Sequence, residues 1–195
     1  MISPDDISQK TDEELVVLTL KNEDNFLYLM RKYEDKLRRY IQRITNLSNE
    51  DTEDVLQDTF IKVYRHLNEF DKSLKFSSWI YRIAHNQAIS NFRRAKARPE
   101  GNYYDLTEDG LKNLMDETDI EKDIDDKINR EKIKSILNRL DSKYREVLVL
   151  KFLDQKDYNE ISDILKKPLG TVATLIRRAK RKFEEIAKKE NIKFN

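Results

Sequence analysis

The sequence contains no cysteine, and among its 195 residues there are only three glycines and three prolines. The absence of cysteine excludes disulfide bonds, thiolate zinc sites and cysteine nucleophiles, and it suits a reducing compartment, so we expect a cytoplasmic protein. Glycine and proline build the tight turns of β-sandwiches and β-barrels, so their scarcity argues against both folds. The chain should therefore be almost entirely helical.

Long apolar runs and motifs for catalysis are also missing. The longest apolar stretches, such as residues 147–150, fall far short of the roughly 20 residues that cross a bilayer, so we expect no membrane insertion. The two histidines, His66 and His85, fall in separate expected helices, and no glycine-rich phosphate loop is present. We therefore predict a protein without catalytic residues, metal ions or cofactors of its own.

The charged residues, which make up 38% of the chain and sum to only +1, are sorted into blocks. Five acids and no base lie in residues 46–61, and nine bases against two acids lie in residues 62–98. Eleven acids against two bases follow in residues 99–126, and seven bases without an acid occupy residues 166–182. Two basic regions separated by an acidic one indicate contacts with a polyanion despite the near-zero net charge.

Apolar residues recur at steps of three and four in both halves of the chain, as they do along one face of an amphipathic helix. The pattern predicts helices near residues 12–20 and 23–45, and about four helices in each half. Between the halves the periodicity lapses, and this stretch carries many of the acids. The predicted fold is therefore all-α: two small helical domains, residues 1–98 and 129–195, joined by an acidic flexible linker over residues 99–128.

Residues 158–181 have the pattern of a helix-turn-helix. A short apolar period precedes residues 166–170, which contain this half's only proline and glycine, and the second helix is expected to begin at Thr171. Threonine and arginine near the start of such a helix can reach base edges and phosphates in a major groove. The candidates on the face opposite the core are Thr171, Thr174, Arg177, Arg178 and Arg181. A merely solvated helix is the alternative, but such a helix usually mixes acids with its bases.

The stretch from Phe76 to Arg94 combines aromatic rings and amides with bases, which suits a single nucleic-acid strand. Unpaired bases stack on aromatic rings with about 1–3 kcal/mol each, while cations bind the phosphates. The candidate residues are Phe76, Trp79, His85, Asn86, Ser90, Arg93 and Arg94. The alternative for the rings is ordinary core packing, because aromatic residues at helical spacing more often lie in a core.

Three motifs, in this order and at these separations, resemble bacterial sigma-70-type factors. They are Asp54-Val-Leu-Gln57-Asp58-Thr-Phe60, Phe76-Ser-Ser-Trp79-Ile-Tyr-Arg-Ile-Ala-His-Asn86 and Pro168-Leu-Gly170-Thr171-Val172. The short, two-domain form is similar to the extracytoplasmic-function group, and the resemblance covers about residues 11–98 and 130–187. It implies that the first domain is sigma region 2 and the last is sigma region 4.

The resemblance also implies that both domains bind core RNA polymerase, through its β′ and β subunits, and that each reads one promoter element. Residues at four positions fall where the family contacts the β′ coiled coil: Asp54, Gln57, Asp58 and Phe60. Acids here suit a basic partner, although acids near a helix start also complement the helix dipole, by about 0.3–1 kcal/mol each. As an initiation subunit, the protein would not be an enzyme.

The same resemblance implies roles for the two candidate DNA surfaces. The set from Phe76 to Arg94 falls where the family captures the melted minus-10 element, with Asn68–Lys75 as its base-specificity loop. The set from Thr171 to Arg181 falls on the minus-35 recognition helix. Ser90 stands where many relatives have aspartate and Leu175 where arginine is common, so the promoter sequence stays open.

An anti-sigma protein is a further expected partner, since something must restrain a factor that competes for polymerase. The acidic linker either threads toward the polymerase RNA path or serves as a plain spacer. Two other functions stay open from the residues alone: a stand-alone helix-turn-helix transcriptional regulator, and a scaffold that uses its helical bundles for protein contacts.

Overall fold

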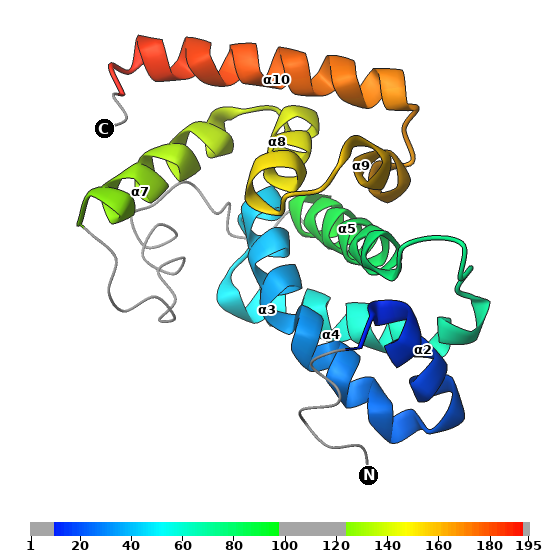
Figure 1. Cartoon of the computed structure of the whole chain (residues 1–195). Helices are drawn as coiled ribbons and strands as arrows, with labels where there is room; N and C mark the ends of the chain where they lie inside the picture. Colours follow the sequence, from blue (N-terminus) through cyan, green and yellow to red (C-terminus); the bar gives the residue numbers. More distant parts are fainter. Residues whose placement is uncertain (1–9, 98–123, 193–195) are drawn as a thin grey trace.

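The structure, a computed structural model, describes residues 10–97 and 124–192, and every regular element in these ranges is a helix (Figure 1). The first range contains α2 (Asp12–Lys21), a 3-10 turn at Glu23–Asn25, α3 (Phe26–Thr45), α4 (Asn49–Arg65), a second 3-10 turn at Leu67–Glu69, and α5 (Phe76–Ala97). The second range contains α7 (Ile124–Arg139), α8 (Ser142–Leu148), the π-helical turn η3 (Val149–Leu153), α9 (Tyr158–Leu165) and α10 (Leu169–Lys189). The predicted all-α class, with two helical regions, is confirmed.

The predicted linker, residues 99–128, lies outside the described residues up to position 123. α7 begins at Ile124, earlier than the position 129 at which the second domain was expected to start. The apolar period that set this expectation begins only after several charged positions. A helical backbone can continue through such positions.

Local polar side chains determine where several helices begin and end. Thr11 and Glu14 form a capping box on α2, in which the Thr11 hydroxyl accepts from the Glu14 amide at 3.2 Å and the Glu14 carboxylate accepts from the Thr11 amide at 2.8 Å. Ser48 caps α4 by accepting from the Asp51 amide at 3.0 Å. α3 ends where Asn46 adopts a left-handed φ of 61°, which asparagine tolerates better than most residues. Each cap satisfies backbone groups that the helix leaves unpaired.

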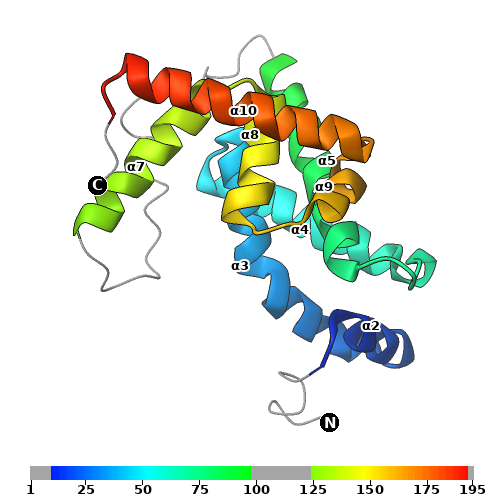
Figure 2. The same ribbon diagram turned by 45° about the horizontal axis from the view of Figure 1, so that its top comes forward.

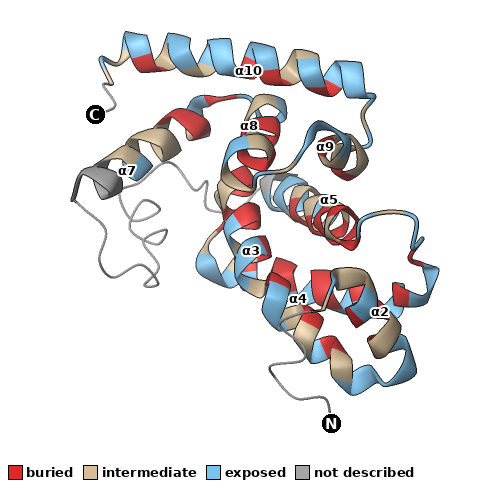
Figure 3. Cartoon of the chain, in the orientation of Figure 1, coloured by how far each residue is buried: buried red, intermediate tan, exposed pale blue. Residues whose placement is uncertain are grey.

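The long helix α3 lies at the centre of the fold. Leu29, Leu37 and Ile41 of this helix are fully buried. α3 packs against α4 and α5, and also against α8 and η3 of the second half. Figure 3 shows the same division, with buried residues on the facing sides of α3, α4 and α5 and exposed residues on their outer sides. α10 covers α7, α8 and α9 on the far side of the second half (Figure 1).

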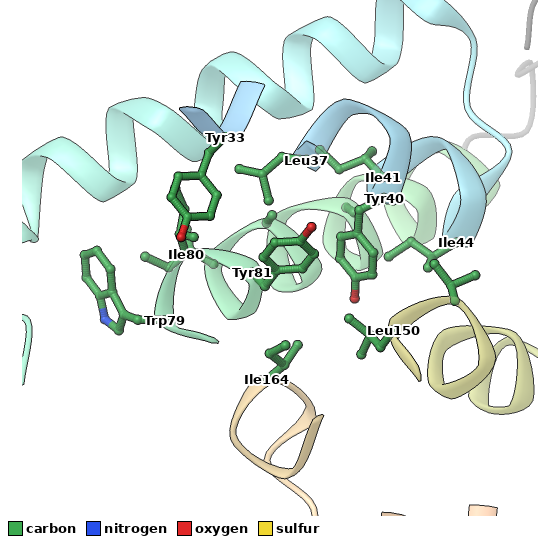
Figure 4. Packing of buried hydrophobic residues seen from close by; sticks show 14 of the residues in the cluster. Tyr33, Leu37, Tyr40, Ile41, Ile44, Trp79, Ile80, Tyr81, Leu150 and Ile164 are labelled. Carbon is green, nitrogen blue, oxygen red and sulfur yellow. The ribbon is translucent and has the colours of Figure 1, made fainter. Parts of the chain in front are cut away.

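The two halves share one apolar core. α9 packs along α5, an arrangement that can be followed from both directions in Figures 1 and 2. Figure 4 shows Leu150 and Ile164 of the second half beneath Tyr40 and Tyr81 of the first, and these four residues are at most 2% exposed. Leucine and isoleucine side chains buried this completely contribute about 1.5–3 kcal/mol each. The two halves are therefore joined by a shared hydrophobic core.

Candidate nucleic-acid interface

The predicted helix-turn-helix is formed by α9 and α10, but its turn differs from the expected one. The residue with left-handed backbone in this turn is Lys166, with a φ of 51°. Gly170 has no positive φ and lies inside the first turn of α10, which begins at Leu169 rather than at Thr171. The expectation of a turn that contains glycine is thus wrong. Pro168 fixes the backbone directly before α10, so the helix can begin there.

α10 has a buried face and an exposed face (Figure 3). Val172, Ile176 and Ala179 are at most 3% exposed and belong to the core. The predicted DNA-binding residues lie on the other side. Thr174 is half-buried there, and the other four are exposed: Thr171, Arg177, Arg178 and Arg181. The Thr174 hydroxyl donates to the Gly170 carbonyl at 2.9 Å, and Arg181 lies 3.5 Å from Glu185. Arg177 and Arg178 form no ion pair within the described ranges, so both guanidinium groups are available to a ligand.

Three of the residues predicted on α5 form one exposed stripe. Asn86, Ser90 and Arg93 are three and four positions apart, so they lie on one face of the helix, and all three are exposed. Arg94 is exposed beside this stripe, and its Nε donates to the Ser90 carbonyl at 3.4 Å. An amide, a hydroxyl and two guanidinium groups on one helix surface match the hydrogen-bonding groups of bases and phosphates.

Phe76 and Trp79 belong to the core rather than to this stripe. Phe76 is 0% exposed and Trp79 is 9% exposed. Their ring centroids lie 5.7 Å apart, and both rings contact Phe70, at 5.5 Å and 5.4 Å. Tyr33 packs on Phe76 at 5.6 Å from the opposite helix. In this conformation neither ring can stack on a nucleic-acid base, because protein side chains already cover it. Both rings instead hold the first turn of α5 in the bundle.

His85 faces the second half of the protein rather than the exposed stripe. Its Nδ1 lies 3.0 Å from the Tyr40 hydroxyl, and its Nε2 lies 3.9 Å from a Glu146 carboxylate oxygen. Burial lowers the pKa of His85 to about 4, and the nearby Lys167 and Arg93 act in the same direction. Burial raises the pKa of Glu146 to about 6. As the pH falls, Glu146 gains its proton before His85 does, so their contact is not an ion pair.

Asp154 is a second buried carboxylate between the halves. Its Oδ1 lies 3.3 Å from Arg43 Nη1 of α3, but its Oδ2 is buried without a hydrogen-bond partner among the described residues. Burial raises the pKa of Asp154 to about 6, although the charges of Arg43 and Lys156 act in the opposite direction. Its ionised form is therefore costly where it lies, and protonation relieves that cost.

The predicted polymerase-binding residues divide between an acidic ridge and an apolar groove. The exposed residues of the ridge lie on one face of α4, and they are Asp54, Gln57 and Asp58. Phe60 is only 5% exposed and, together with Gln57, lines a groove of about 660 Å³ between α3 and α4. Ile61 and Tyr64 line the same groove and are each 43% exposed. Neither residue was predicted from the sequence as part of the site, because single exposed apolar side chains leave no periodic signal. The groove and the ridge together suit a protein partner that is both apolar and basic.

Metal sites and membrane-spanning helices are absent from the described ranges. No group of three or more His, Asp or Glu residues in these ranges is placed to hold a metal ion, and no helix there is long and apolar enough to cross a bilayer. His66 is exposed and lies 3.1 Å from Glu69. The candidate binding surfaces described above are the exposed faces of α4, α5 and α10.

Two sequence families match the chain in the order of its two halves. Sigma-70 region 2 matches residues 29–98, and Sigma-70, region 4 matches residues 130–183. The ECF RNA polymerase sigma factor SigW of Bacillus subtilis is 33% identical over 170 residues, which cover 82% of this chain and 87% of the relative. The ECF RNA polymerase sigma-E factor of Haemophilus influenzae is 32% identical over 185 residues, which cover 90% of this chain and 95% of the relative.

Two solved structures are similar in fold. The structure of CnrH in complex with the cytosolic domain of CnrY has a TM-score of 0.67 and 22% identity, and the match covers 92% of this chain and 98% of that chain. The sigma factor RpoE in complex with the anti-sigma factor NepR from Bartonella quintana has a TM-score of 0.63 and 20% identity, with 84% and 97% covered. Because the sequence identities are this low, these two comparisons show a similar fold and nothing more.

We expect the substitution Asp154→Asn to change the free energy of unfolding in a way that depends on pH. Because the pKa of Asp154 is raised in the folded protein, this group stabilises the fold below about pH 4, and that contribution is lost as the pH rises through about 6. Asparagine does not titrate, so the variant lacks this pH-dependent contribution to stability. Between about pH 5 and pH 8 the variant should therefore gain about 1 kcal/mol relative to the natural protein, measured by urea denaturation.

The substitution His85→Gln is the matched control, with the opposite sign. Because the pKa of His85 is lowered in the folded protein, its contribution is present above about pH 6.5 and is lost as the pH falls through about 4. The glutamine variant should therefore be relatively more stable at about pH 5 than at about pH 8. A constant difference from the natural protein at both pH values, in either variant, would contradict the burial of that group.

Proposed function

The chain belongs to the extracytoplasmic-function group of sigma-70 RNA polymerase sigma factors, which are non-catalytic initiation subunits, and we propose that it directs core polymerase to promoters through two DNA contacts. In this proposal α10 reads the minus-35 element as a duplex, and α5 captures the melted minus-10 element. The observation that carries it is that each half presents one exposed basic helix face, with Arg93 and Arg94 on α5 and with Arg177 and Arg178 on α10.

The shape of α10 supports binding in a major groove. Nothing lies within 4 Å of the place where Gly170 would carry a side chain, so a DNA backbone can approach the start of the helix closely. Thr171 is exposed in the same turn, and the free amides of a helix start attract phosphates. Arg177 and Arg178 lie further along, where guanidinium groups can bind guanine edges or phosphates. Leu175 is half-buried, which reduces the polar contacts that this helix can make.

The exposed stripe of α5 supports capture of unpaired bases. The Asn86 amide can hydrogen-bond to a base edge, while Ser90, Arg93 and Arg94 suit the sugar-phosphate backbone. Binding of a flipped base selects DNA that is already open, so melting needs no nucleotide hydrolysis. The contacts to captured bases offset unstacking costs of a few kcal/mol. Phe76 and Trp79 take part indirectly, by fixing the start of α5 beside the segment Asn68–Lys75.

The α4 surface supports attachment to polymerase. The carboxylates of Asp54 and Asp58 suit the basic side chains of a partner, and the groove lined by Gln57 and Phe60 suits its apolar ones. We assign this surface to the β′ subunit, and contacts of the second half to the β subunit. Both assignments follow from the family, in which regions 2 and 4 bind core polymerase.

An inhibitory partner and a cellular location complete the proposal. RpoE, whose fold is similar, was solved with the anti-sigma factor NepR, and we propose that this chain is also restrained by an anti-sigma protein. Such restraint is useful because a free sigma factor competes with others for polymerase. Transcription in bacteria takes place in the cytoplasm, so we place the protein there.

We expect purified protein and core RNA polymerase to start transcription at a defined position on a promoter that core polymerase alone does not select. Sequencing of the transcripts measures this. The substitution Asp58→Lys should weaken binding to core about tenfold, because it places a cation against a basic partner. Glu131→Lys in α7 makes the same change of charge outside the α4 surface, so it should weaken binding less than Asp58→Lys does. A protein that binds DNA alone and never binds core would instead be a stand-alone regulator.

The double substitution Arg177→Ala with Arg178→Ala should weaken binding of the holoenzyme to duplex DNA that carries the upstream element. Each lost phosphate contact reduces the dependence of log affinity on log salt by about 0.9, so the slope should fall by up to about 2. The matched control is Lys188→Ala with Lys189→Ala, which removes two cations from the last turn of the same helix. Filter binding at several salt concentrations measures both slopes. If the salt dependence of the arginine variant is unchanged, the α10 face does not contact the DNA.

A further inference from the structure

A hydrogen bond joins the first turn of α2 to the first residue of α5. Glu13 is half-buried in that turn, and its Oε1 accepts from the Phe76 amide at 3.1 Å. The two residues are 63 positions apart in the chain. Amides at the start of a helix have no partner within the helix, and Phe76 is the first residue of α5. Glu13 thus caps α5 from a different helix.

The residue directly before α5 cannot supply this cap. A capping side chain accepts from the amides of the first turn, as serine, threonine, aspartate and asparagine do. Lys75 stands before α5, and its ammonium group can only donate hydrogen bonds. The Glu13 carboxylate supplies both the missing acceptor and a negative charge, which is favourable at the positive end of a helix. The start of α5 therefore depends on a residue outside its own segment.

The neighbouring residue Asp12 holds the turn that carries Glu13. The Asp12 carboxylate accepts from the Tyr33 hydroxyl, and its Oδ1 lies 2.7 Å from Lys32 Nζ, so both partners belong to α3. Successive residues of a helix are rotated by about 100°, so Asp12 can face α3 while Glu13 faces α5. The Tyr33 ring also packs on the Phe76 ring, with 5.6 Å between their centroids. The first turn of α2 is therefore fixed between α3 and α5.

The segment that leads into α5, residues 70–75, is anchored at its two ends. At one end the buried Phe70 packs on the Phe76 ring, with 5.5 Å between their centroids. At the other end Glu13 binds the Phe76 amide. Between these ends the Asp71 carboxylate accepts from the backbone amide two residues further on at 2.9 Å, a bond within the segment itself. The place of the exposed residues of this segment relative to α5 therefore depends on the two anchors.

A hollow of about 370 Å³ lies between α2 and this segment. Glu13 and Val17 of α2 line it, and so does the exposed Lys72 of the segment. Side chains do not fill this space, so packing against α2 does not hold the segment on this side. The hydrogen bond from Glu13 to the Phe76 amide spans the same two parts of the fold and provides the connection that packing does not.

We propose that Glu13 is a positioning residue for capture of the minus-10 element. It fixes the start of α5, and with it the segment Asn68–Lys75, so that the exposed side chains of the segment and of the α5 stripe meet the same DNA strand. This inference rests on the function proposed above for α5 and for that segment. Glu13 acts through the Phe76 amide and does not itself bind DNA, because its carboxylate would repel the phosphates.

Three substitutions of Glu13 test this role. Glu13→Ala removes the acceptor, Glu13→Asp keeps the charge but is one methylene group too short to reach the amide, and Glu13→Gln keeps the length and a neutral acceptor. With core polymerase, the alanine and aspartate variants should open a promoter about fivefold less, measured by the permanganate reactivity of unpaired thymines. The glutamine variant should stay within about twofold of the natural protein. Binding to core, measured separately, should be unchanged in all three variants.

Glu14→Ala is the matched control, because the Glu14 carboxylate caps α2 itself by accepting from the Thr11 amide. This variant should weaken α2 and leave promoter opening within about twofold of the natural protein. Normal opening by both Glu13→Ala and Glu13→Asp would overturn the inference. An equal loss of opening in Glu14→Ala would overturn it as well, since Glu13 would then act only through the stability of α2.

Hydrogen exchange in the free protein tests the contact without polymerase. The Phe76 amide should exchange about tenfold faster in Glu13→Ala than in the natural protein, measured by NMR, while the Ile41 amide in α3 keeps its rate. An unchanged rate at Phe76 would show that Glu13 does not hold this amide, and the inference would be wrong. If the natural protein itself opens no promoter with core polymerase, the proposed function is overturned, whatever the exchange rate shows.

Discussion

The burial of Tyr40 is the constraint on which the rest of the structure depends. The ring is completely buried at the centre of the shared core, and its centroid lies 5.0 Å from that of Tyr81. Burial raises the pKa of Tyr40 well above its ordinary value, so the hydroxyl keeps its proton and needs a hydrogen-bond partner. His85 Nδ1 lies within hydrogen-bond distance of it. A buried hydroxyl without a partner would cost about 1–3 kcal/mol, so α3 and α5 are held in this register.

α5 has two different surfaces, one that faces the second half of the protein and one that faces solvent. Successive residues of a helix are rotated by about 100°, so Asn86 points to solvent while His85 points toward the second half of the protein. The same helix thus contributes to the core between the halves and presents the stripe that we assign to DNA.

The surfaces differ in how well their sequence patterns predicted them. On α10 the prediction of an exposed basic face is confirmed, because a helical period of apolar residues defines the buried side and leaves Arg177 and Arg178 on the other. On α5 the aromatic residues were ambiguous, since the spacing of Phe76 and Trp79 suits both a core and a stacking surface. Their contacts with Phe70, from a different segment of the chain, decide for the core. No pattern within one helix contains that information.

The sequence by itself determined the helical class, the order of the two halves, and the family that its motifs resemble. These properties depend on local composition and on periodicity, which act over a few neighbouring residues. Only the tertiary structure decided that the halves share a core, that Asp154 and Glu146 are buried between them, and that Lys75 binds the start of α9. Each of these contacts joins residues far apart in the chain. Their existence depends on which faces meet after folding, and the linear order of the residues does not specify that.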